Sequence, residues 1–166
     1  MTEFRARPTV YKGIKMRSRL EAGFAAWLDE NGFEWEYEPQ AFASEKGQYL
    51  PDFKLSEIDV AASATDATSA TAYVEVKPDS FEFSDVDEHA RLARSMAVIH
   101  ESEPHTLLLL VRPSSVFALG TTPGRFGWAP MSWVWAGDTT SVRPVGLVFP
   151  LPRHRGPWPD EFWRVD

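Results

Sequence analysis

Four polar residues stand where their side chains could form a cation site. Glu75 and Lys77 are two residues apart in the run AYVEVK, whose strict alternation predicts a strand with both side chains on one face. Asp52 lies among the hydrophobic residues of another strand-like run, QYLPDFKL. Glu21 lies on the border of the apolar stripe of a predicted helix, about 100° from Leu20, and can lean toward the sheet. Three carboxylates that meet would repel one another without a cation, so the set predicts a cation site.

Each of these residues also has an ordinary explanation. Glu75 and Lys77 can form a solvated salt-bridged pair on an exposed strand face. Asp52 can be a turn residue after Pro51, and Glu21 can be an exposed acid on a helix. These separate explanations leave the joint order unexplained: a helical Glu, a strand, Pro-Asp before a hydrophobic residue, a variable loop, and then an alternating strand with Glu and Lys.

The element that positions Glu21 is a helix predicted over residues 16–30. Hydrophobic residues recur there at the spacing of one buried face, at Leu20, Phe24, Trp27 and Leu28. Asn31 and Gly32 then provide a C-terminal stop. Residues 33–38 (FEWEYE) alternate apolar and acidic side chains and predict a half-buried strand that Pro39 ends.

The strands that position the other three residues flank a stretch of unusual composition. Residues 48–55 predict a strand in which Pro51 indicates an edge, an irregularity or a bulge. Residues 56–72 include AASATDATSATA, almost all Ala, Ser and Thr, and predict an exposed, mobile hairpin loop. A short helix is the alternative, because Ala is a strong helix former. Residues 72–77 then predict the strand of Glu75 and Lys77, stopped by Pro78.

A second helix is predicted through about residue 100, opened at Ser84 and Asp87 by a pattern that resembles a capping box. Its apolar stripe consists of Leu92, Met96 and Ile99. Residues 106–111 (TLLLLV) form a continuous apolar run, typical of a central strand covered on both faces. Residues 116–119 predict one more short strand.

The chain changes character from Gly120 onward, where seven of the thirteen Pro and five of the seven Trp residues lie. Short strands are predicted over residues 132–136 and 145–149. The order of helix, strands, helix and strands predicts an α/β or α+β fold, with one mixed sheet and helices packed on it. We expect a single domain, with a core over residues 1–119 and a Trp- and Pro-rich extension over 120–166 packed on that core.

The 166-residue chain has an ordinary globular composition, with 43% hydrophobic and 25% charged residues. It contains no Cys, which excludes disulfides and thiolate metal sites. No apolar run reaches the roughly 20 residues of a membrane span. The start of the chain, MTEFRARPTVYKG, lacks the apolar core of a secretory signal, so we expect a cytoplasmic protein that does not bind membranes.

The net charge of −7 is unevenly distributed along the chain. An N-terminal arm carries basic residues and no acidic residue among them: Arg5, Arg7, Lys12, Lys15, Arg17 and Arg19. A basic arm beside an acidic body fits a protein that contacts phosphate at one place, although a solvated N-terminus has the same composition.

In this order, the runs RSRLEA, WEYEP, YLPDF and VEVKP resemble a known family. Pro51-Asp52 and Glu75-Val76-Lys77 resemble the PD-(D/E)XK signature of restriction-endonuclease-like nucleases. Glu21 is similar to the helical glutamate of phage junction-resolving and transposon-end-cleaving endonucleases. The whole run also looks like small nucleases encoded by phages of actinobacteria. The resemblance covers residues 11–100 and does not extend beyond residue 119. It implies a restriction-endonuclease-like core, with a central mixed sheet flanked by helices.

The resemblance also implies a Mg²⁺-dependent deoxyribonuclease in which Mn²⁺ can substitute. Asp52, Glu75 and Glu21 would then supply carboxylate ligands, and the carbonyl of Val76 a neutral one. Lys77, the fourth catalytic residue, would orient the attacking water and stabilise charge on the phosphate. Contacts to DNA phosphates would come from Lys15, Arg17 and Arg19 and, more weakly, from Arg91 and Arg94.

Within this family, a structure-selective endonuclease fits the short chain better than a sequence-specific restriction enzyme, and an exonuclease remains open. The expected setting is a bacterial or phage-infected cell, and a homodimer is a reasonable expectation. No Gly-rich phosphate loop is present, so we expect no nucleotide cofactor. The alternatives are a non-catalytic binding module that kept the fold, for phage–host interaction or assembly, and a nuclease subunit that needs a DNA-binding partner.

Overall fold

The computed structural model describes residues 6–63, 66–81, 86–122, 125–135 and 146–149. They form a mixed α+β structure with a large central sheet and two small two-stranded sheets. The elements in chain order are β1 (Thr9–Tyr11), β2 (Ile14–Met16), α1 (Arg19–Glu30), β3 (Trp35–Tyr37), β4 (Phe42–Ser44), β5 (Gly47–Tyr49), β6 (Phe53–Ser63), β7 (Asp66–Val76), α2 (Val86–Ala97), α3 (Ile99–Ser102), β8 (Leu107–Arg112), β9 (Ser115–Thr122), β10 (Arg125–Trp135) and β11 (Gly146–Phe149).

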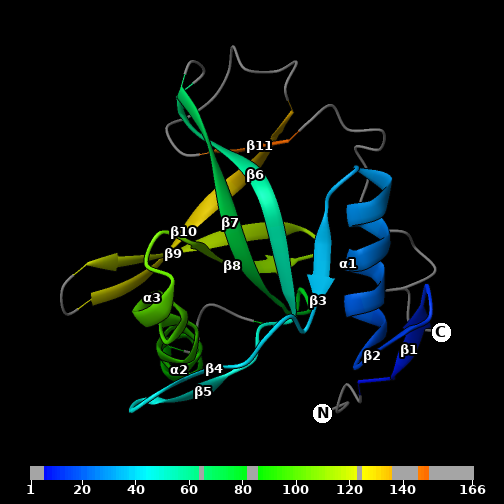
Figure 1. The fold of residues 1–166 in the computed structure, drawn as a ribbon, viewed down its shortest axis with the longest axis horizontal. Coiled ribbons are helices and arrows are strands. Elements are labelled where there is room, and N and C mark those ends of the chain that lie inside the picture. Colours follow the sequence, from blue (N-terminus) through cyan, green and yellow to red (C-terminus); the bar gives the residue numbers. More distant parts are fainter. Residues whose placement is uncertain (1–5, 64–65, 82–85, 123–124, 136–145, 150–166) are drawn as a thin grey trace.

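The central sheet has the strand order β11-β10-β9-β8-β7-β6-β3 among the described residues. The pairs β7–β8 and β10–β11 are parallel and the other neighbours are antiparallel, so the predicted mixed sheet is confirmed. A parallel pair requires a long crossover, and α2 with α3 provides it between β7 and β8. β11 pairs with both β10 and β6, so strands β6 to β11 close into a ring and β3 lies outside it on β6 (Figure 1).

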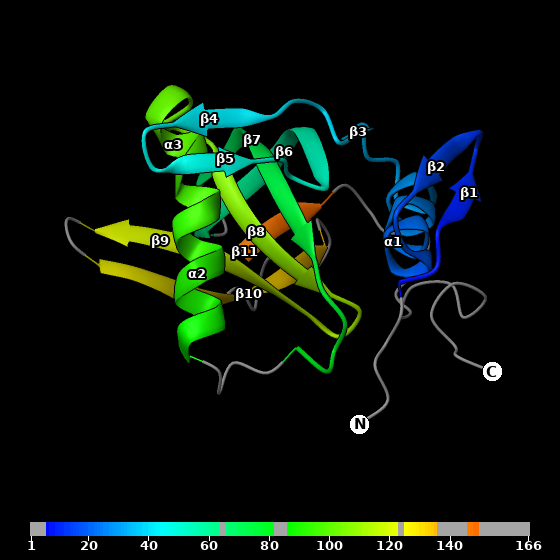
Figure 2. The same ribbon diagram turned by 90° about the horizontal axis from the view of Figure 1, so that it is seen from below.

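Both faces of the sheet are covered, as Figure 2 shows for α1 on one side and α2 on the other. On the first face, Phe24 and Leu28 of α1 pack in one cluster with Phe53 of β6 and with Val74 and Val76 of β7. A second cluster on the other face consists of Tyr73, Leu108 and Leu119 from the sheet, Ala93 and Met96 from α2, Ile99 from α3, Val98 and Phe42. The alternation along β7 therefore places Glu75 and Lys77 together on one side, as predicted, and this side is the α2 face.

The predicted first helix begins three residues too early, because α1 starts at Arg19 and not at residue 16. Residues 14–16 belong to β2, which pairs with β1 through a turn at Lys12 and Gly13. Both turn residues have positive φ, 48° and 81°, as a two-residue hairpin turn of type I′ requires. Ser18 then caps the helix, since its hydroxyl accepts the backbone N–H of Glu21 at 3.1 Å. The predicted stop is confirmed, with Asn31 as the C-cap.

The prediction of a loop over residues 56–72 is wrong, and so is its helical alternative. β6 runs to Ser63 and β7 begins at Asp66, so most of this stretch lies in two long antiparallel strands. The hairpin itself is confirmed. Small residues pack few side-chain atoms, but the backbone of β6 bonds to β7 on one edge and to β3 and β11 on the other. Pairing on both edges satisfies the backbone polar groups and overrides the weak local preference.

The predicted strand over residues 48–55 is interrupted, because β5 ends at Tyr49 and β6 begins at Phe53. The irregularity that Pro51 suggested lies between these strands, and a second one follows between Leu55 and Ile58. The second predicted helix is observed as α2 and α3, while the predicted cap at Ser84 lies outside the described residues.

The predicted central strand over residues 106–111 is confirmed as β8, which lies between β7 and β9. The strands predicted over residues 116–119, 132–136 and 145–149 correspond to β9, β10 and β11, of which β9 and β10 are longer than predicted. The expected division after residue 119 falls inside β9, and the described part of the extension continues the same sheet. Among the described residues, no helix has the length and apolar character that crossing a membrane requires.

Candidate functional site

Asp52 lies at the centre of the candidate site, in the bend before β6, and only 3% of the residue is exposed. Its backbone is held from both sides: its N–H donates to the carbonyl of Val74 at 3.0 Å, and its carbonyl accepts the N–H of Glu38 at 2.9 Å. Its side chain turns toward the end of β7, where Oδ2 accepts the backbone N–H of Val76 at 2.8 Å. The carboxylate is therefore fixed against β7, directly beside the residues predicted to share its site.

The second oxygen of Asp52 is held by Arg17, whose guanidinium forms a hydrogen-bonded ion pair with Oδ1. Arg17 also pairs through Nε with Glu38 at 2.8 Å. The side chain of Arg17 is 55% exposed while that of Asp52 is 4% exposed, so Arg17 is the solvent-facing member of the pair. Arg17 was predicted as a contact to DNA phosphate, and here its cation is part of the carboxylate cluster.

Glu21 reaches the same cluster from the first turn of α1 and is 8% exposed. Its Oε2 accepts the hydroxyl of Tyr37 at 2.6 Å and the backbone N–H of Arg17 at 3.2 Å. Its Oε1 accepts the hydroxyl of Ser18, the helix cap, at 2.9 Å. The capping arrangement thus fixes the Glu21 carboxylate beside the backbone of the residue that pairs with Asp52.

Glu75 and Lys77 form an ion pair with Nζ and Oε1 2.8 Å apart, as two residues on one strand face can. The other oxygen of Glu75 accepts the hydroxyl of Tyr49, at the end of β5, at 2.5 Å. The backbone N–H of Lys77 donates to the carbonyl of Val111 at 2.9 Å, which continues the β7–β8 pairing past the end of β7. The pair is therefore held on two sides at the end of β7.

The charges of these groups act on one another. Burial raises the pKa of Asp52 well above its ordinary value, and the negative charges of Glu75 and Glu21 add to this effect. The N–H of Val76 and the charge of Arg17 oppose it. Burial and the charges of Glu75 and Asp52 also raise the pKa of Tyr49, so its hydroxyl keeps the proton that it donates.

The pKa of Lys77 is also raised, although burial acts against it. Burial acts to lower the pKa of Lys77, but the charge of Glu75 and the hydrogen bond to it outweigh burial, and the pKa rises. The charge of Asp52 raises the pKa of Lys77 further. Lys77 is therefore an ammonium ion throughout the neutral range.

The composition of the cluster fits a divalent cation. When all are ionised, the carboxylates of Glu21, Glu38, Asp52 and Glu75 face the cations of Arg17 and Lys77, which leaves a formal charge of −2. Mg²⁺ prefers such carboxylate oxygens. The arrangement is nevertheless occupied by protein donors: in the described residues, no three Asp, Glu or His side chains are placed to hold a metal ion. The donor chemistry fits the metal, while in the present arrangement Arg17 holds Oδ1 of Asp52.

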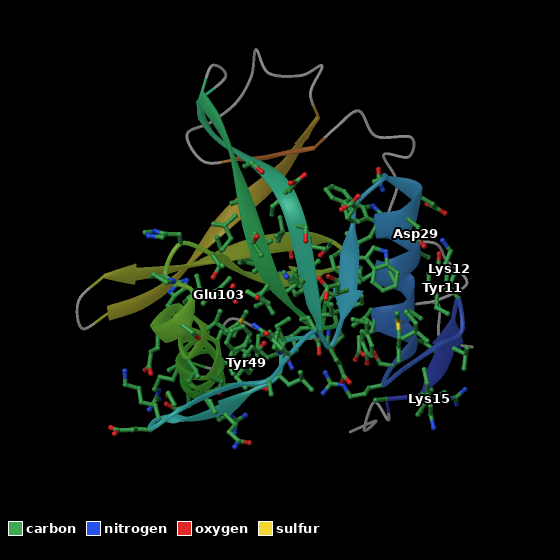
Figure 3. The ribbon with its side chains drawn as sticks, viewed as in Figure 1. Tyr11, Lys12, Lys15, Asp29, Tyr49 and Glu103 are labelled. Carbon is green, nitrogen blue, oxygen red and sulfur yellow. The ribbon has the colours of Figure 1, made fainter. Side chains whose placement is uncertain are left out.

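The charges of Glu21 and Glu75 both act on Asp52, and Lys77 pairs with Glu75, so Asp52 is the residue that links the four. Glu21 approaches Asp52 from α1, while Glu75 and Lys77 lie on the α2 face of the sheet. Of the other predicted residues, Val76 contributes its N–H to Asp52. Lys15 lies exposed on the hairpin β1–β2, at the opposite end from Lys12 and Tyr11 (Figure 3). Arg19 is half-buried in the first turn of α1.

Arg91 and Arg94, the weaker predicted DNA contacts, lie apart from the four-residue cluster. They are exposed on α2 and line a groove of about 730 Å³ between α2 and β5. Acids on or beside the groove offset its positive charge, since Lys46 pairs with Glu101 of the lining at 2.9 Å and Arg91 lies 3.8 Å from the neighbouring Glu88. Gln48 also lines the groove, whereas the next residue of β5, Tyr49, bonds to Glu75.

Sequence reasoning missed the residues that hold the carboxylates in place: Ser18, Tyr37, Glu38 and Tyr49. One signal was present, since Ser18 and Glu21 have the spacing of a capping box. A second was the alternation of FEWEYE, which places Tyr37 on the same strand face as Phe33 and Trp35. The contact of Tyr49 with Glu75 joins residues 26 positions apart and has no local signal.

Any functional conclusion rests on the geometry of the site, because comparison with family models and curated proteins finds no relative. No protein-family model matches the chain, and no curated protein matches it either.

Proposed function

We propose that this protein is a metal-dependent DNA nuclease with a restriction-endonuclease-like core, most consistent with a structure-selective endonuclease. The observation that carries the proposal is the convergence of a buried Asp52 with Glu21, Glu75 and Lys77, which come from α1, the start of β6 and the end of β7. Carboxylates that are costly to bury separately are brought together here, which supports a site for a cation.

In this function, the carboxylates of Asp52, Glu75 and Glu21 would hold a divalent ion. The bound ion supplies an activated water and screens the negative charge that develops on the phosphate. Tyr49 and the N–H of Val76 orient Glu75 and Asp52, so the chain fixes its ligands before metal or substrate binds. Lys77 is held by Glu75 with a side chain 29% exposed, which leaves its ammonium able to meet a phosphate oxygen.

DNA as the substrate is supported by the cations at the entrance. Lys15 is exposed on β2, Arg17 is exposed between β2 and α1, and Arg19 begins α1. Arg17 contacts both Glu21 and Asp52, so a phosphate bound by its guanidinium would lie beside Asp52. The preference for a DNA structure over a base sequence, and a homodimer that cuts two strands, stay predictions.

A second function is favoured by one observation. The oxygens of Glu21, Asp52 and Glu75 all accept hydrogen bonds or ion pairs from protein donors. A self-sufficient polar cluster of this kind also suits a binding module that kept the fold without cutting DNA. The acidic net charge of −7 agrees with that alternative.

A cleavage assay separates the two functions. The purified protein is incubated with supercoiled plasmid, a four-way junction and a linear duplex, each with Mg²⁺, Mn²⁺ or EDTA. The nuclease proposal expects cutting that needs metal, favours the junction, and disappears in Asp52→Ala and Lys77→Ala. Glu34→Gln, on an exposed side chain outside the cluster, should cut like the unmodified protein. Binding of the junction without cutting under every metal condition would support the binding module.

A further inference from the structure

We propose that Arg17 is a resident cation that closes the metal site, and that a DNA phosphate opens the site by drawing the guanidinium away from Asp52. This inference rests on the proposed nuclease function and adds to it a device that makes metal binding depend on substrate. It assigns Arg17 a second role besides phosphate contact, namely control over whether Asp52 is available as a ligand.

The first argument is the occupancy of the oxygens of Asp52. Oδ2 is held by the backbone N–H of Val76, and Oδ1 by the guanidinium of Arg17. The N–H of Val76 belongs to the sheet and cannot move away without disrupting β7. Arg17 is therefore the donor whose departure would leave Oδ1 of Asp52 open to a cation.

The second argument is that the backbone of Arg17 is held separately from its guanidinium, whose ion pairs with Asp52 and Glu38 would open as the side chain turns. Arg17 lies between β2 and α1, and its backbone N–H donates to the hydroxyl of Tyr37 at 2.9 Å as well as to Glu21. The guanidinium lies at the end of a flexible side chain that is 55% exposed. Movement of this side chain toward solvent would uncover the 4% exposed side chain of Asp52 without disturbing the helix cap.

The third argument is that phosphate is the ligand best suited to displace the pair. A guanidinium binds phosphate through two parallel charge-assisted hydrogen bonds, as it binds a carboxylate. A phosphate bound there would exchange one anionic partner of Arg17 for another. Asp52 would then be a buried carboxylate without its cation, whose charge must be neutralised by a proton or by a divalent ion.

Charge balance gives the exchange its direction. With Arg17 in place, the cluster has a formal charge of −2, and departure of the guanidinium makes it −3. Repulsion among Glu21, Asp52 and Glu75 then favours the metal more strongly. By linkage, DNA must tighten metal binding by the same factor by which metal tightens DNA binding.

The test is calorimetric titration of Mn²⁺ into the full-length protein without DNA, which measures binding and not activity. Arg17→Gln removes the guanidinium, and Arg7→Gln is the matched control, because Arg7 is an exposed arginine of the same basic arm. We expect Arg17→Gln to bind Mn²⁺ at least tenfold more tightly than the unmodified protein, and Arg7→Gln to bind within twofold of it. In the double variant Arg17→Gln with Asp52→Asn, the gain should disappear.

A second measurement does not depend on the folding of a variant. The unmodified protein is titrated with Mn²⁺ in the presence of a nuclease-resistant phosphorothioate duplex, after subtraction of the heat from the duplex alone. The inference expects the duplex to tighten Mn²⁺ binding at least tenfold, and to have little effect on Arg17→Gln. Equal Mn²⁺ affinity with and without Arg17, or with and without duplex, would overturn the inference while a metal-dependent nuclease stands. Absence of Mn²⁺ binding in every variant would overturn the nuclease proposal as well.

Discussion

Asp52 is bonded through its side chain to the backbone of Val76, with Oδ2 accepting the N–H at 2.8 Å. Val76 stands between Glu75 and Lys77, so this one bond sets the position of Asp52 relative to both. The start of β6 is thereby tied to the end of β7 at the point where the polar cluster lies. Asp52 and Lys77 lie one residue outside the two strands, so the pairing of β6 with β7 and this bond together hold them in place.

The first prediction concerns metal-dependent stability. Because a ligand that binds only the folded state stabilises it by mass action, Mn²⁺ at one hundred times its Kd should raise the free energy of unfolding by about 2.7 kcal/mol. Asp52→Asn should abolish most of this rise, since the amide replaces a carboxylate ligand. Thermal unfolding with and without Mn²⁺ measures the effect. Glu34→Gln is the control that should keep the full rise, and an equal rise in Asp52→Asn would exclude Asp52 as a ligand.

The second prediction concerns the ammonium of Lys77. Lys77→Gln should lower the rate of DNA cleavage by roughly 10²–10³-fold, the range for loss of one group that stabilises transition-state charge. Lys54→Gln is a closely matched control, because Lys54 also pairs with a glutamate from a sheet strand, with an exposed fraction of 31% against 29% for Lys77. Single-turnover cleavage of a labelled junction measures both rates. Equal losses in the two variants would point to a general charge effect and not to a catalytic lysine.

Sequence periodicity predicted the elements whose burial pattern is strong. Phe24, Trp27 and Leu28 recur at helical spacing and are buried on α1. The run of leucines in β8 predicted a strand covered on both faces, and Leu108, Leu109 and Leu110 are at most 1% exposed. These predictions succeed because the buried face of a helix or strand is recorded in the spacing of hydrophobic residues along that one element.

The predictions failed where structure depends on distant partners. The stretch of Ala, Ser and Thr after Ser56 carries almost no local signal, and β6 takes its conformation from pairing with β3, β7 and β11. The ion pair between Arg17 and Asp52 joins residues 35 positions apart. Sequence alone indicated that both residues are near phosphate chemistry, but not that one neutralises the other.

The third prediction concerns Tyr49, which positions Glu75. Tyr49→Phe removes the hydroxyl that donates to Glu75 at 2.5 Å, so the carboxylate loses one of its two fixed partners. Mn²⁺ affinity should fall by about tenfold, the lower end for loss of a group that orients a metal ligand. The free energy of unfolding should fall by about 1 kcal/mol.

The control for Tyr49 removes a hydroxyl of the same kind far from the cluster. Tyr11→Phe deletes the bond from Tyr11 to Asp29, which is 2.8 Å long. It should cost similar stability and leave Mn²⁺ affinity unchanged, as measured by denaturant unfolding and calorimetry. Should both variants lose Mn²⁺ affinity equally, Tyr49 would have no specific role in orienting Glu75.

The last prediction concerns acid stability at Asp29, which joins the hairpin β1–β2 to the end of α1 (Figure 3). Burial acts to raise the pKa of Asp29, but hydrogen bonds from Lys12, Trp35 and Tyr11 outweigh it and lower the pKa below 3.8. A lowered pKa means that the ionised carboxylate stabilises the fold above pH 3.8, and that this stability is lost as the pH falls through the folded value. Asp29→Asn should therefore lower the melting temperature at pH 7 and have little effect near pH 2. The loss in free energy of unfolding at pH 7 should stay below about 1 kcal/mol, because the ion pair with Lys12 is screened by solvent. Thermal unfolding of both proteins from pH 2 to pH 7 measures the difference, and a difference that stays constant with pH would show that the Asp29 charge contributes nothing.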